Sequence, residues 1–548
     1  MGRPTHVVAN QPPPLTGYDV FGADVALVDA VSRHAPGADL GRLHELGRLA
    51  GGETAQEWGR LANTHTPVLR THDRFGNRID EVEFHPAWHD LMRTAVGYGL
   101  AGAPWTSKEP APHVWRAAAF LTWSQAEGGH GCPISMTYAA IPAIRTDPVL
   151  AAEWEPRLAS TAYGDQLLRE PGTKPGCLAG MGMTEKQGGT DVRANTTEAV
   201  PLAADGEYLL TGHKWFCSAP MCDVFLVLAQ APGGLTCFLV PRVLPDGSRN
   251  VFALQRLKDK LGNKSNASSE VEFDGTWARR LGDEGRGVST IIGMVSATRL
   301  DCTIGSAALM RRAVAEAVHH AAYRHVGGKA LVDQPLMTNV LADLAVESEA
   351  ATTLAIRMAA AYGSSEPREQ ALFRIAVAVS KYWTTKRGIA VAAEAMECLG
   401  GNGYVEDGGM PRLYREAPVN AIWEGSGNVQ ALDVLRALRR EPACLDAFLL
   451  ELGTARGTDH RYDAAVRDFL TELADLDGIE VRARRLVERM ALLLEASVLL
   501  RWSTPEVADA FCASRLGGEG GLMFGTLPRG VDAASIVART RPLLPSGI

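Results

Sequence analysis

The chain has 548 residues, of which 46% are hydrophobic and 22% are charged, with a formal net charge of −8 and a pI near 6.0. A chain of this length is too long for one hydrophobic core, so we expect two or more packed units. The mildly acidic balance gives no general electrostatic reason to bind nucleic acid or an anionic membrane.

The sequence shows no signal for membrane insertion, secretion or a redox-active cysteine pair. The apolar run "MALLLEASVLL" is interrupted by Glu495 and is too short to span a bilayer, and "MGRPTHVVANQPPPL" lacks the apolar core of a secretory signal. The nine cysteines are scattered, and none falls in a C-x-x-C pattern. We therefore expect a cytoplasmic protein with buried thiols, no membrane contact and no bound metal. A redox pair of Cys217 and Cys222 is the disfavoured alternative, because basic neighbours are lacking.

The first part of the chain is alanine-rich and punctuated like a series of helices, which predicts an N-terminal helical domain over residues 1–179. From residue 207 to about 274 the pattern changes to short β-branched and aromatic runs, such as "EYLLTGHKWF" and "VFLVLAQA". Pro-Gly-Gly and Pro-Asp-Gly turns separate them, as in an antiparallel sheet or a small barrel. We assign residues 180–282 to a β-domain.

After residue 287 a helical period returns, and we expect helices over 288–322, 334–361, 369–399 and 428–440. Their lengths suit an antiparallel bundle over residues 283–440. Residues 441–548 are again mostly helical and form an extension. The predicted fold class is α+β: an N-terminal helical domain, a central antiparallel β-domain and a C-terminal helical bundle, with an extra helical unit.

One glycine-rich stretch, "GMGMTEKQGGTDVRA" (residues 180–194), precedes the β-domain and so is not the strand–loop–helix of a dinucleotide-binding fold. An ordinary turn is the alternative reading. Glycines let backbone amides approach a flat ring closely, and the hydroxyls of Thr184 and Thr190 add hydrogen-bonding groups. Such a loop suits a cofactor with a hydrogen-bonding edge, as an isoalloxazine has.

Two further patterns carry candidate chemistry. Lys214, Phe216 and Ser218 alternate, so a strand would put them on one face, although an ordinary strand with core aromatics has the same pattern. In "AIWEGSGNVQ", Glu424 stands between Trp423 and a glycine. A carboxylate against an apolar wall can be basic enough to remove a proton. Its alternative role is a charge at a helix N-terminus, stabilised by the helix dipole.

Both patterns lie next to longer motifs that resemble a known family. "GMTEKQGGTDVRA" has the form of the first signature of acyl-CoA dehydrogenases, and "ECLGGNGYVEDGGMPRLYRE" fits their second signature. Their order and spacing also match, over about residues 50–440. Within that family, the whole chain resembles a subfamily of flavoproteins induced in the bacterial adaptive response to DNA alkylation.

The resemblance implies FAD as cofactor. Thr184, Glu185, Gly189 and Thr190 match the first flavin loop, together with Met183. Phe216 matches an aromatic that lies against the flavin, and Ser218 matches a hydroxyl near N5. For the rest of the cofactor, the matching positions are Arg324 at the pyrophosphate, Glu397, Gly400 and Gly401 in a second loop, and Ser426 and Asn428 toward the adenine. Near Arg324 the family's phenylalanine and proline are replaced by Gly327 and Ala330, which puts the binding of the adenine half in question.

The resemblance also implies that Glu424 is the catalytic base, removing the α-proton of an acyl-CoA while a hydride passes to flavin N5. In some relatives the base precedes an arginine on the long helix, but here that position, before Arg299, is Thr298. Trp423 replaces a usual tyrosine and predicts a narrower channel, hence weak activity on short or branched acyl-CoA. Arg436 either faces this site or is an ordinary salt-bridged helix residue.

Several partners follow from the resemblance. The second cofactor loop comes from a neighbouring subunit in this family, so we expect a homo-oligomer and specifically a tetramer. Electrons would leave to an electron-accepting flavoprotein or to oxygen. The alternative function is a DNA-associated flavoprotein that protects against alkylation, and a third is an FAD-bound scaffold without turnover.

Charge bears on the DNA alternative. Residues 441–548 contain twelve arginines, no lysine and sixteen acidic residues, a net charge of −4. The basic cluster "RARRLVER" (Arg482, Arg484, Arg485 and Arg489) alternates with acidic residues. Since DNA binding depends on neutralising phosphates, we expect weak, salt-sensitive affinity at most.

Overall fold

The computed structural model describes residues 5–165, 173–475 and 477–542. The chain separates into two compact units, the first made of Met1–Glu53 with Cys302–Ile548 and the second of Thr54–Asp301. The first 53 residues thus belong with the C-terminal half. This division is coarser than the four predicted domains, whose boundaries stay predictions. Their outer limits at residues 1 and 548 lie outside the described residues.

Among the residues that the structure describes, the regular elements of unit 1 are helices and one short hairpin. Its elements are α1 (Val25–His34), α2 (Leu40–Ala50), β10 (His325–Val326), β11 (Lys329–Ala330), α9 (Pro335–Gly363), α10 (Pro367–Cys398), α11 (Gly401–Tyr404), α12 (Met410–Asn420), α13 (Gly427–Arg440), α14 (Pro442–Gly453), α15 (His460–Ala474), α16 (Ile479–Trp502), α17 (Pro505–Phe511) and α18 (Ala533–Thr540). Helix α8 (Gly287–Tyr323) contains the point at which the two units divide, and α3 (Glu53–Thr64) begins at the other.

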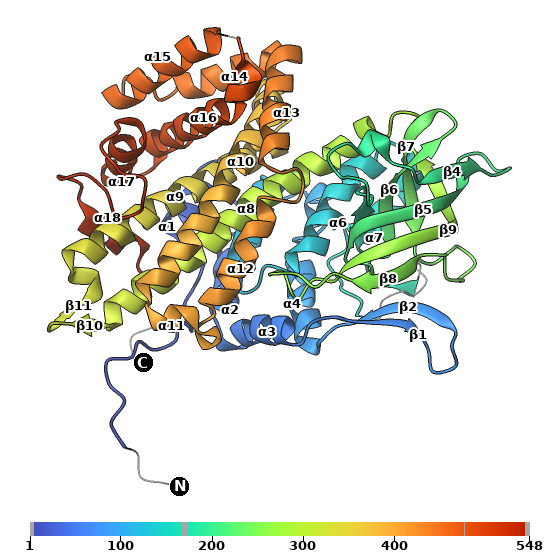
Figure 1. The fold of residues 1–548 in the computed structure, drawn as a ribbon, viewed down its shortest axis with the longest axis horizontal. Coiled ribbons are helices and arrows are strands. Elements are labelled where there is room, and N and C mark those ends of the chain that lie inside the picture. The colour runs from blue at the N-terminus through green and yellow to red at the C-terminus, as the bar shows by residue number, and fades with distance from the viewer. Residues whose placement is uncertain (1–4, 166–172, 476, 543–548) are drawn as a thin grey trace. The chain divides into compact units, whose positions relative to one another are not determined.

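The four helices predicted for the bundle are confirmed to within two residues at each end, as α8, α9, α10 and α13. Proline in the first turn explains two of the starts, because its fixed φ suits that position and its missing N–H is not needed there: Pro335 opens α9 and Pro367 opens α10. Helices α9 and α10 pack side by side as the long yellow and orange helices of Figure 1.

Helix α9 carries three buried carboxylates, Asp343, Glu347 and Glu349. Two arginines of the C-terminal extension contact all three. Arg515 contacts Asp343 at 2.5 Å and Glu347 at 3.0 Å, while Arg539 contacts Glu349 at 3.1 Å. Burying a carboxylate is costly unless it is paired, so these ion pairs fix the extension to the bundle. The predicted extra helical unit is therefore an integral part of unit 1.

Unit 2 combines helices with a β-barrel. Its helices are α3, α4 (Pro86–Gly97), α5 (Pro112–Ser124), α6 (Gly131–Ile144) and α7 (Pro148–Leu158). A hairpin of β1 (Val68–His72) and β2 (Arg78–Glu83) lies inside the stretch that we expected to be helical. Its turn is stabilised by Asp73, whose side chain accepts hydrogen bonds from the backbone N–H groups of Phe75 and Asn77.

The predicted β-domain is confirmed as a small barrel. Its strands are β3 (Ala179–Gly182), β4 (Glu198–Pro201), β5 (Glu207–Ser218), β6 (Val224–Ala231), β7 (Gly234–Pro241), β8 (Ala253–Leu257) and β9 (Ser268–Leu281). The order β6-β4-β5-β9-β7 closes through the β6–β7 pairing, with β3 added to β6 and β8 to β9. Most pairs are antiparallel, as expected, but β6 pairs in parallel with β3 and with β4. Figure 1 shows this barrel in green.

Of the nine cysteines, all of which lie in the described part of the chain, eight are buried, as predicted, and Cys132 is half-buried. Burial raises the pKa of the Cys217 thiol to about 12, which leaves it protonated and unreactive. Within the described ranges, no helix has the length and apolar character needed to cross a membrane. In the same residues no cluster of His, Cys, Asp or Glu side chains is arranged to hold a metal ion.

Candidate active site

The predicted site residues divide between the two units. Unit 2 holds Met183, Thr184, Gly189, Thr190, Phe216, Ser218 and Arg299, and unit 1 holds Arg324, Glu397, Gly400, Gly401, Trp423, Glu424, Ser426, Asn428 and Arg436. Within each unit the structure shows how these residues are supported.

In unit 2, the glycine-rich loop is anchored by a buried ion pair. Lys214 Nζ lies 2.6 Å from Glu185 Oε1, and both side chains are fully buried. Glu185 also accepts hydrogen bonds from Thr196 N and Thr197 Oγ1. Burial alone would raise the pKa of Glu185, but these donors outweigh it and lower the pKa to about 2. Glu185, which matches the flavin loop by sequence, thus holds the loop in place rather than facing a ligand.

The outer part of this loop has an open face. A Cβ atom at Gly188, whose φ is +158°, would meet nothing within 4 Å, whereas at Gly189 it would lie 2.7 Å from Thr184 Oγ1. Gly189 and Thr190 are exposed and Thr184 is half-buried. The loop therefore presents accessible backbone and hydroxyl groups, as a flat ring with a polar edge requires.

From the sequence, Lys214, Phe216 and Ser218 are expected to share one face of a strand, and strand β5 shows that Lys214 does not share it. Its pairing with β9 shifts register between Lys214 and Cys217. This bulge breaks the alternation, so Lys214 is buried while Phe216 is 51% exposed. Lys214 therefore does not share a face with Phe216, which lies within the shifted stretch, while Ser218 lies after it and pairs in register with Ser268. An aromatic ring this exposed fits a surface that covers a planar ligand.

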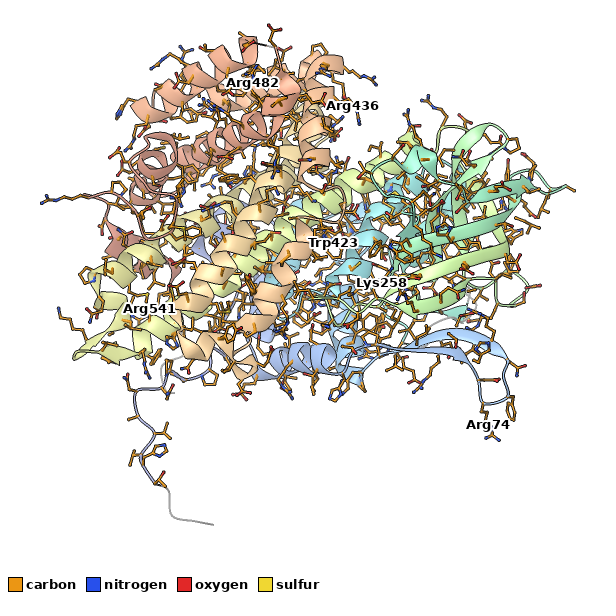
Figure 2. The ribbon with its side chains drawn as sticks, viewed as in Figure 1. Arg74, Lys258, Trp423, Arg436, Arg482 and Arg541 are labelled. Carbon is orange, nitrogen blue, oxygen red and sulfur yellow. The ribbon has the colours of Figure 1, made fainter. Side chains whose placement is uncertain are left out.

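Sequence reasoning missed Lys258, which Figure 2 shows on the β-domain. Its Nζ lies 3.2 Å from the centre of the Trp215 ring and 4.7 Å from that of Phe216, and 2.6 Å from Glu270 Oε1. The lysine thus braces both rings through cation–π contacts. The only sequence signal for it is its place in the lysine-rich stretch "LKDKLGNKSNAS" (residues 257–268).

In unit 1, Glu424 lies on the short loop between α12 and α13 with a φ of +56°. A left-handed backbone at a residue other than glycine, asparagine or aspartate is strained by about 1–3 kcal/mol, and such residues cluster at functional sites. The Glu424 side chain is half-buried, next to the half-buried Trp423. Trp423 Nε1 donates to Asn420 Oδ1 at 3.1 Å, which fixes the indole ring.

Two buried side chains hold this strained loop. Lys381, on α10, donates to the backbone oxygens of Trp423 at 2.7 Å and of Gly425 at 2.5 Å. Gln430, on α13, donates to the oxygens of Glu424 at 3.0 Å and Gly425 at 2.8 Å. Both are at most 1% exposed. The backbone around Glu424 is therefore fixed on either side of its carboxyl group.

Replacing Lys381 with methionine should displace this loop without touching the carboxylate. On the expectation from the sequence resemblance that Glu424 removes a proton while a flavin accepts the hydride, the rate of flavin reduction by substrate should fall by about 10²-fold, because small misplacements of a reacting group are costly. The orphaned carbonyls should lower the free energy of unfolding by about 1–3 kcal/mol. Stopped-flow reduction and denaturant unfolding measure the two effects, with Lys108→Met on an exposed lysine as control. A wild-type reduction rate in Lys381→Met would contradict this role.

The candidate nucleotide residues of unit 1 meet at the N-terminal segment. Arg324 Nη1 donates to the Asn10 oxygen at 2.6 Å, and Asn402 Nδ2, in the second glycine loop, donates to Gln11 Oε1 at 3.1 Å. Glu397, Gly400 and Gly401 are exposed, and a Cβ at either glycine would meet nothing within 4 Å. Residues 10 and 11 thus link Arg324 to the second loop.

The conformation of the backbone explains why Gly327 stands where the family has a phenylalanine. Gly327 and Gly328 form the two-residue turn between β10 and β11, with φ values of +59° and +82°. A turn with positive φ at both positions favours glycine over phenylalanine. The aromatic is replaced because the chain reverses there, a signal that "VGGK" carried and that we did not use.

The remaining predicted residues are placed as follows. Ser426 and Asn428 are exposed at the start of α13. Arg436 is 59% exposed and lies 3.5 Å from Asp433, toward the far end of α13 from Trp423 in Figure 2. Its contact is thus the ordinary salt bridge. In α8, Arg299 and Thr298 are buried, and the Thr298 hydroxyl donates to the Val295 oxygen at 3.0 Å.

Comparison with known proteins gives three consecutive family matches. Residues 10–165 match the adaptive response protein AidB N-terminal domain, 180–276 the acyl-CoA dehydrogenase middle domain and 285–439 the acyl-CoA dehydrogenase C-terminal domain. Their order follows the helical, barrel and bundle segments of the fold.

Two sequence relatives and one solved structure agree with these matches. The putative acyl-CoA dehydrogenase AidB of Escherichia coli is 44% identical over 94% of this chain and 96% of its own length. Acyl-CoA dehydrogenase family member 11 of Caenorhabditis elegans is 33% identical over 78% of this chain and 72% of its own. The crystal structure of C. elegans ACDH-11 in complex with C11-CoA superposes with a TM-score of 0.85 at 28% identity, covering 94% of each chain. The chain belongs to the acyl-CoA dehydrogenase family of flavin-dependent oxidoreductases acting on CH–CH groups, and within it to the AidB branch.

Proposed function

We propose that this chain is an FAD-dependent acyl-CoA dehydrogenase of the AidB type in which Glu424 removes the α-proton of the thioester. The observation that carries the proposal is the Glu424 loop. A strained, left-handed glutamate is held in place by the buried side chains of Lys381 and Gln430. Such support is expected where a carboxyl group must keep one position for chemistry.

The residues present suit FAD as the cofactor of this family. In unit 2, the open loop at Gly188–Thr190, the exposed Phe216 ring and the Ser218 hydroxyl offer what a flavin ring and its edge require. In unit 1, Arg324, the second glycine loop, Ser426 and Asn428 offer a guanidinium and polar groups for the nucleotide end. When bound, FAD accepts a hydride at N5.

The protein's own part in the reaction is proton removal and orientation. The Glu424 carboxylate takes the α-proton, and the Cα–Cβ bond becomes a double bond as the β-hydride leaves. Trp423, held by Asn420, supplies an apolar wall that favours a basic carboxylate by limiting its solvation. Thr298 has no carboxyl group and already donates its hydroxyl to the helix backbone, which leaves Glu424 as the base.

We further propose short or branched acyl-CoA as substrate with weak turnover, because the Trp423 indole takes more room than a tyrosine ring. The worm relative is described in complex with C11-CoA, so longer chains belong in the test. Anaerobic mixing of the purified FAD-loaded protein with acyl-CoAs from four to twelve carbons should bleach the flavin band with the preferred substrates. Bound FAD that no acyl-CoA bleaches would refute dehydrogenation and favour the protective or scaffold functions.

We propose a homo-oligomer, specifically a tetramer, in the cytoplasm. The second cofactor loop supports an interface there, because Tyr404 is 80% exposed and Val405 is 50% exposed directly after it. The electron acceptor would be a partner flavoprotein or oxygen.

The DNA-protective alternative rests on the AidB relationship and on the basic cluster of α16. In the structure three of these arginines are engaged by two carboxylates: Arg485 and Arg489 lie 3.2 Å and 3.0 Å from Glu472, and Arg482 lies 4.0 Å from Glu472 and 3.2 Å from Asp475. Arg484 instead donates to the Tyr382 hydroxyl at 3.2 Å. Arginines engaged in this way have less to offer to phosphates.

We accordingly expect DNA binding to be weak at low salt and to disappear near physiological salt, since few phosphates would be neutralised. A gel-shift titration with duplex DNA at two salt concentrations measures it, comparing the wild type with Arg484→Ala/Arg485→Ala. Tight binding that this double substitution abolishes would show that the cluster does bind DNA.

A further inference from the structure

A chain of three hydrogen-bonded side chains crosses one end of the barrel. Lys260, in the loop between β8 and β9, donates from Nζ to Ser268 Oγ at 3.1 Å. Ser268 Oγ lies 3.1 Å from Ser218 Oγ. The two serines are register partners, at the last residue of β5 and the first of β9. Ser268 is 6% exposed and Ser218 is half-buried, so these hydrogen bonds lead from the buried loop to a partly accessible hydroxyl.

The ammonium group of Lys260 determines which atom donates and which accepts in each of these hydrogen bonds. An ammonium can only donate, so Ser268 Oγ is an acceptor toward Lys260. Among the described residues Ser268 Oγ has no other hydrogen-bond partner than Lys260 and Ser218. The single hydroxyl hydrogen of Ser268 is therefore donated to Ser218 Oγ, and the nearby positive charge strengthens that hydrogen bond. Ser218 becomes the acceptor in the pair, and its own hydrogen is left to point outward as a donor.

The loop holds the ammonium firmly at this place. Lys260 Nζ also donates to the Asn266 oxygen at 2.5 Å and to Asn263 Oδ1 at 3.4 Å. Asn263 is 2% exposed, has a φ of +54°, and accepts a further bond from Asn266 Nδ2 at 2.9 Å. Ser265 ties the loop to Glu127 Oε1 at 2.8 Å. A buried left-handed turn with this many contacts keeps the ammonium on the serine pair.

We propose that Lys260 is a positioning residue, which orients the Ser218 hydroxyl as a donor to the flavin edge and thereby raises the reduction potential of the bound flavin. The proposal rests on the proposed function, in which Ser218 faces that edge. Accepting a hydride would place a hydrogen on N5 and add one negative charge to the flavin ring system, so the positive charge of Lys260, relayed through the oriented hydroxyl dipoles, would stabilise the reduced form more than the oxidised form. Without the ammonium, Ser218 can turn its hydrogen toward Ser268 and the preference is lost.

The test compares FAD-loaded wild type with Lys260→Met by spectroelectrochemical titration. We expect the equilibrium constant for two-electron reduction to fall about tenfold, which is a potential about 30 mV more negative. Lys260→Arg keeps a cationic donor and should restore most of the difference. Lys264→Met is the matched control, because Lys264 is a lysine of the same loop that pairs with Asp259 at 2.9 Å and does not touch the serines.

Ser268→Ala provides a second measurement if Lys260→Met folds poorly. It keeps the lysine but removes the link, and should lower the potential similarly. An unchanged potential in both Lys260→Met and Ser268→Ala, with FAD bound normally, would overturn the role of Lys260 and leave the proposed function intact. An equal shift in Lys264→Met would overturn it too, as a general charge effect. Wild-type protein that takes up no FAD would refute the proposed function itself.

Discussion

Glu424→Gln should retain FAD but lose its reduction by acyl-CoA, with the rate constant falling by about 10²–10⁴-fold. Glutamine keeps the size and polarity of the side chain and removes its basicity, so the loss reports the proton transfer alone. Anaerobic stopped-flow spectroscopy of the flavin band measures the rate, and the absorbance ratio of flavin to protein measures FAD content.

Two further variants serve as controls, one at an exposed glutamate elsewhere and one that uses the left-handed backbone of Glu424. Glu366→Gln, at an exposed glutamate before α10, should reduce at the wild-type rate. Glu424→Gly should be as inactive as Glu424→Gln yet unfold at higher denaturant, gaining about 1 kcal/mol, because glycine adopts the φ of +56° without strain. Rapid bleaching in Glu424→Gln would eliminate the carboxylate as the base.

The largest expected effect on stability comes from the buried ion pair of Arg116, on α5, with Asp301, on α8. Both side chains are at most 3% exposed, and Arg116 Nη2 donates to Asp301 Oδ2 at 2.8 Å. The Arg116 guanidinium also lies 4.0 Å from the centre of the Tyr138 ring. Arg116→Met should lower the free energy of unfolding by about 3–5 kcal/mol, since it leaves an uncompensated buried carboxylate. Denaturant unfolding followed by circular dichroism measures the change.

Two comparisons separate this effect from the loss of any arginine. Arg145→Met breaks a partly exposed pair with Glu155 and should cost no more than about 1 kcal/mol. The double variant Arg116→Met/Asp301→Asn removes both charges and should recover part of the lost stability. If Arg116→Met unfolds like Arg145→Met, burial does not make this pair important.

Most of the helical and barrel framework was predictable, because the signals are local. Proline at the first turn and sustained helical periods located α9 and α10 closely, and the run "VFLVLAQA" coincides with β6. The hairpin of β1 and β2 was missed because its turn depends on one aspartate side chain, Asp73, within polar surroundings. The parallel pairings of β6 were missed because they join strands separated along the sequence.

The candidate site was predictable only as far as its motifs reach. The glycine loop and Glu424 stand in recognisable signatures, but the bulge that separates Lys214 from Phe216 depends on the pairing of β5 with β9. Lys381 is more than forty residues from the loop that it holds, as the hydrogen bond to Trp423 shows. Likewise, the basic run of α16 gave no sign that Glu472, on α15, would engage three of its arginines.

The carboxylates buried on α9 determine where this polypeptide can be truncated without loss of their counter-ions. The region shared with ordinary acyl-CoA dehydrogenases ends near residue 440, yet Asp343, Glu347 and Glu349 depend for their counter-ions on Arg515 and Arg539, far beyond it. A fragment that stops at that limit would leave Asp343 and Glu349 without these arginines and Glu347 with only Arg387. The minimal dehydrogenase region is therefore not an independent module within this polypeptide, because its buried carboxylates draw part of their charge compensation from the extension.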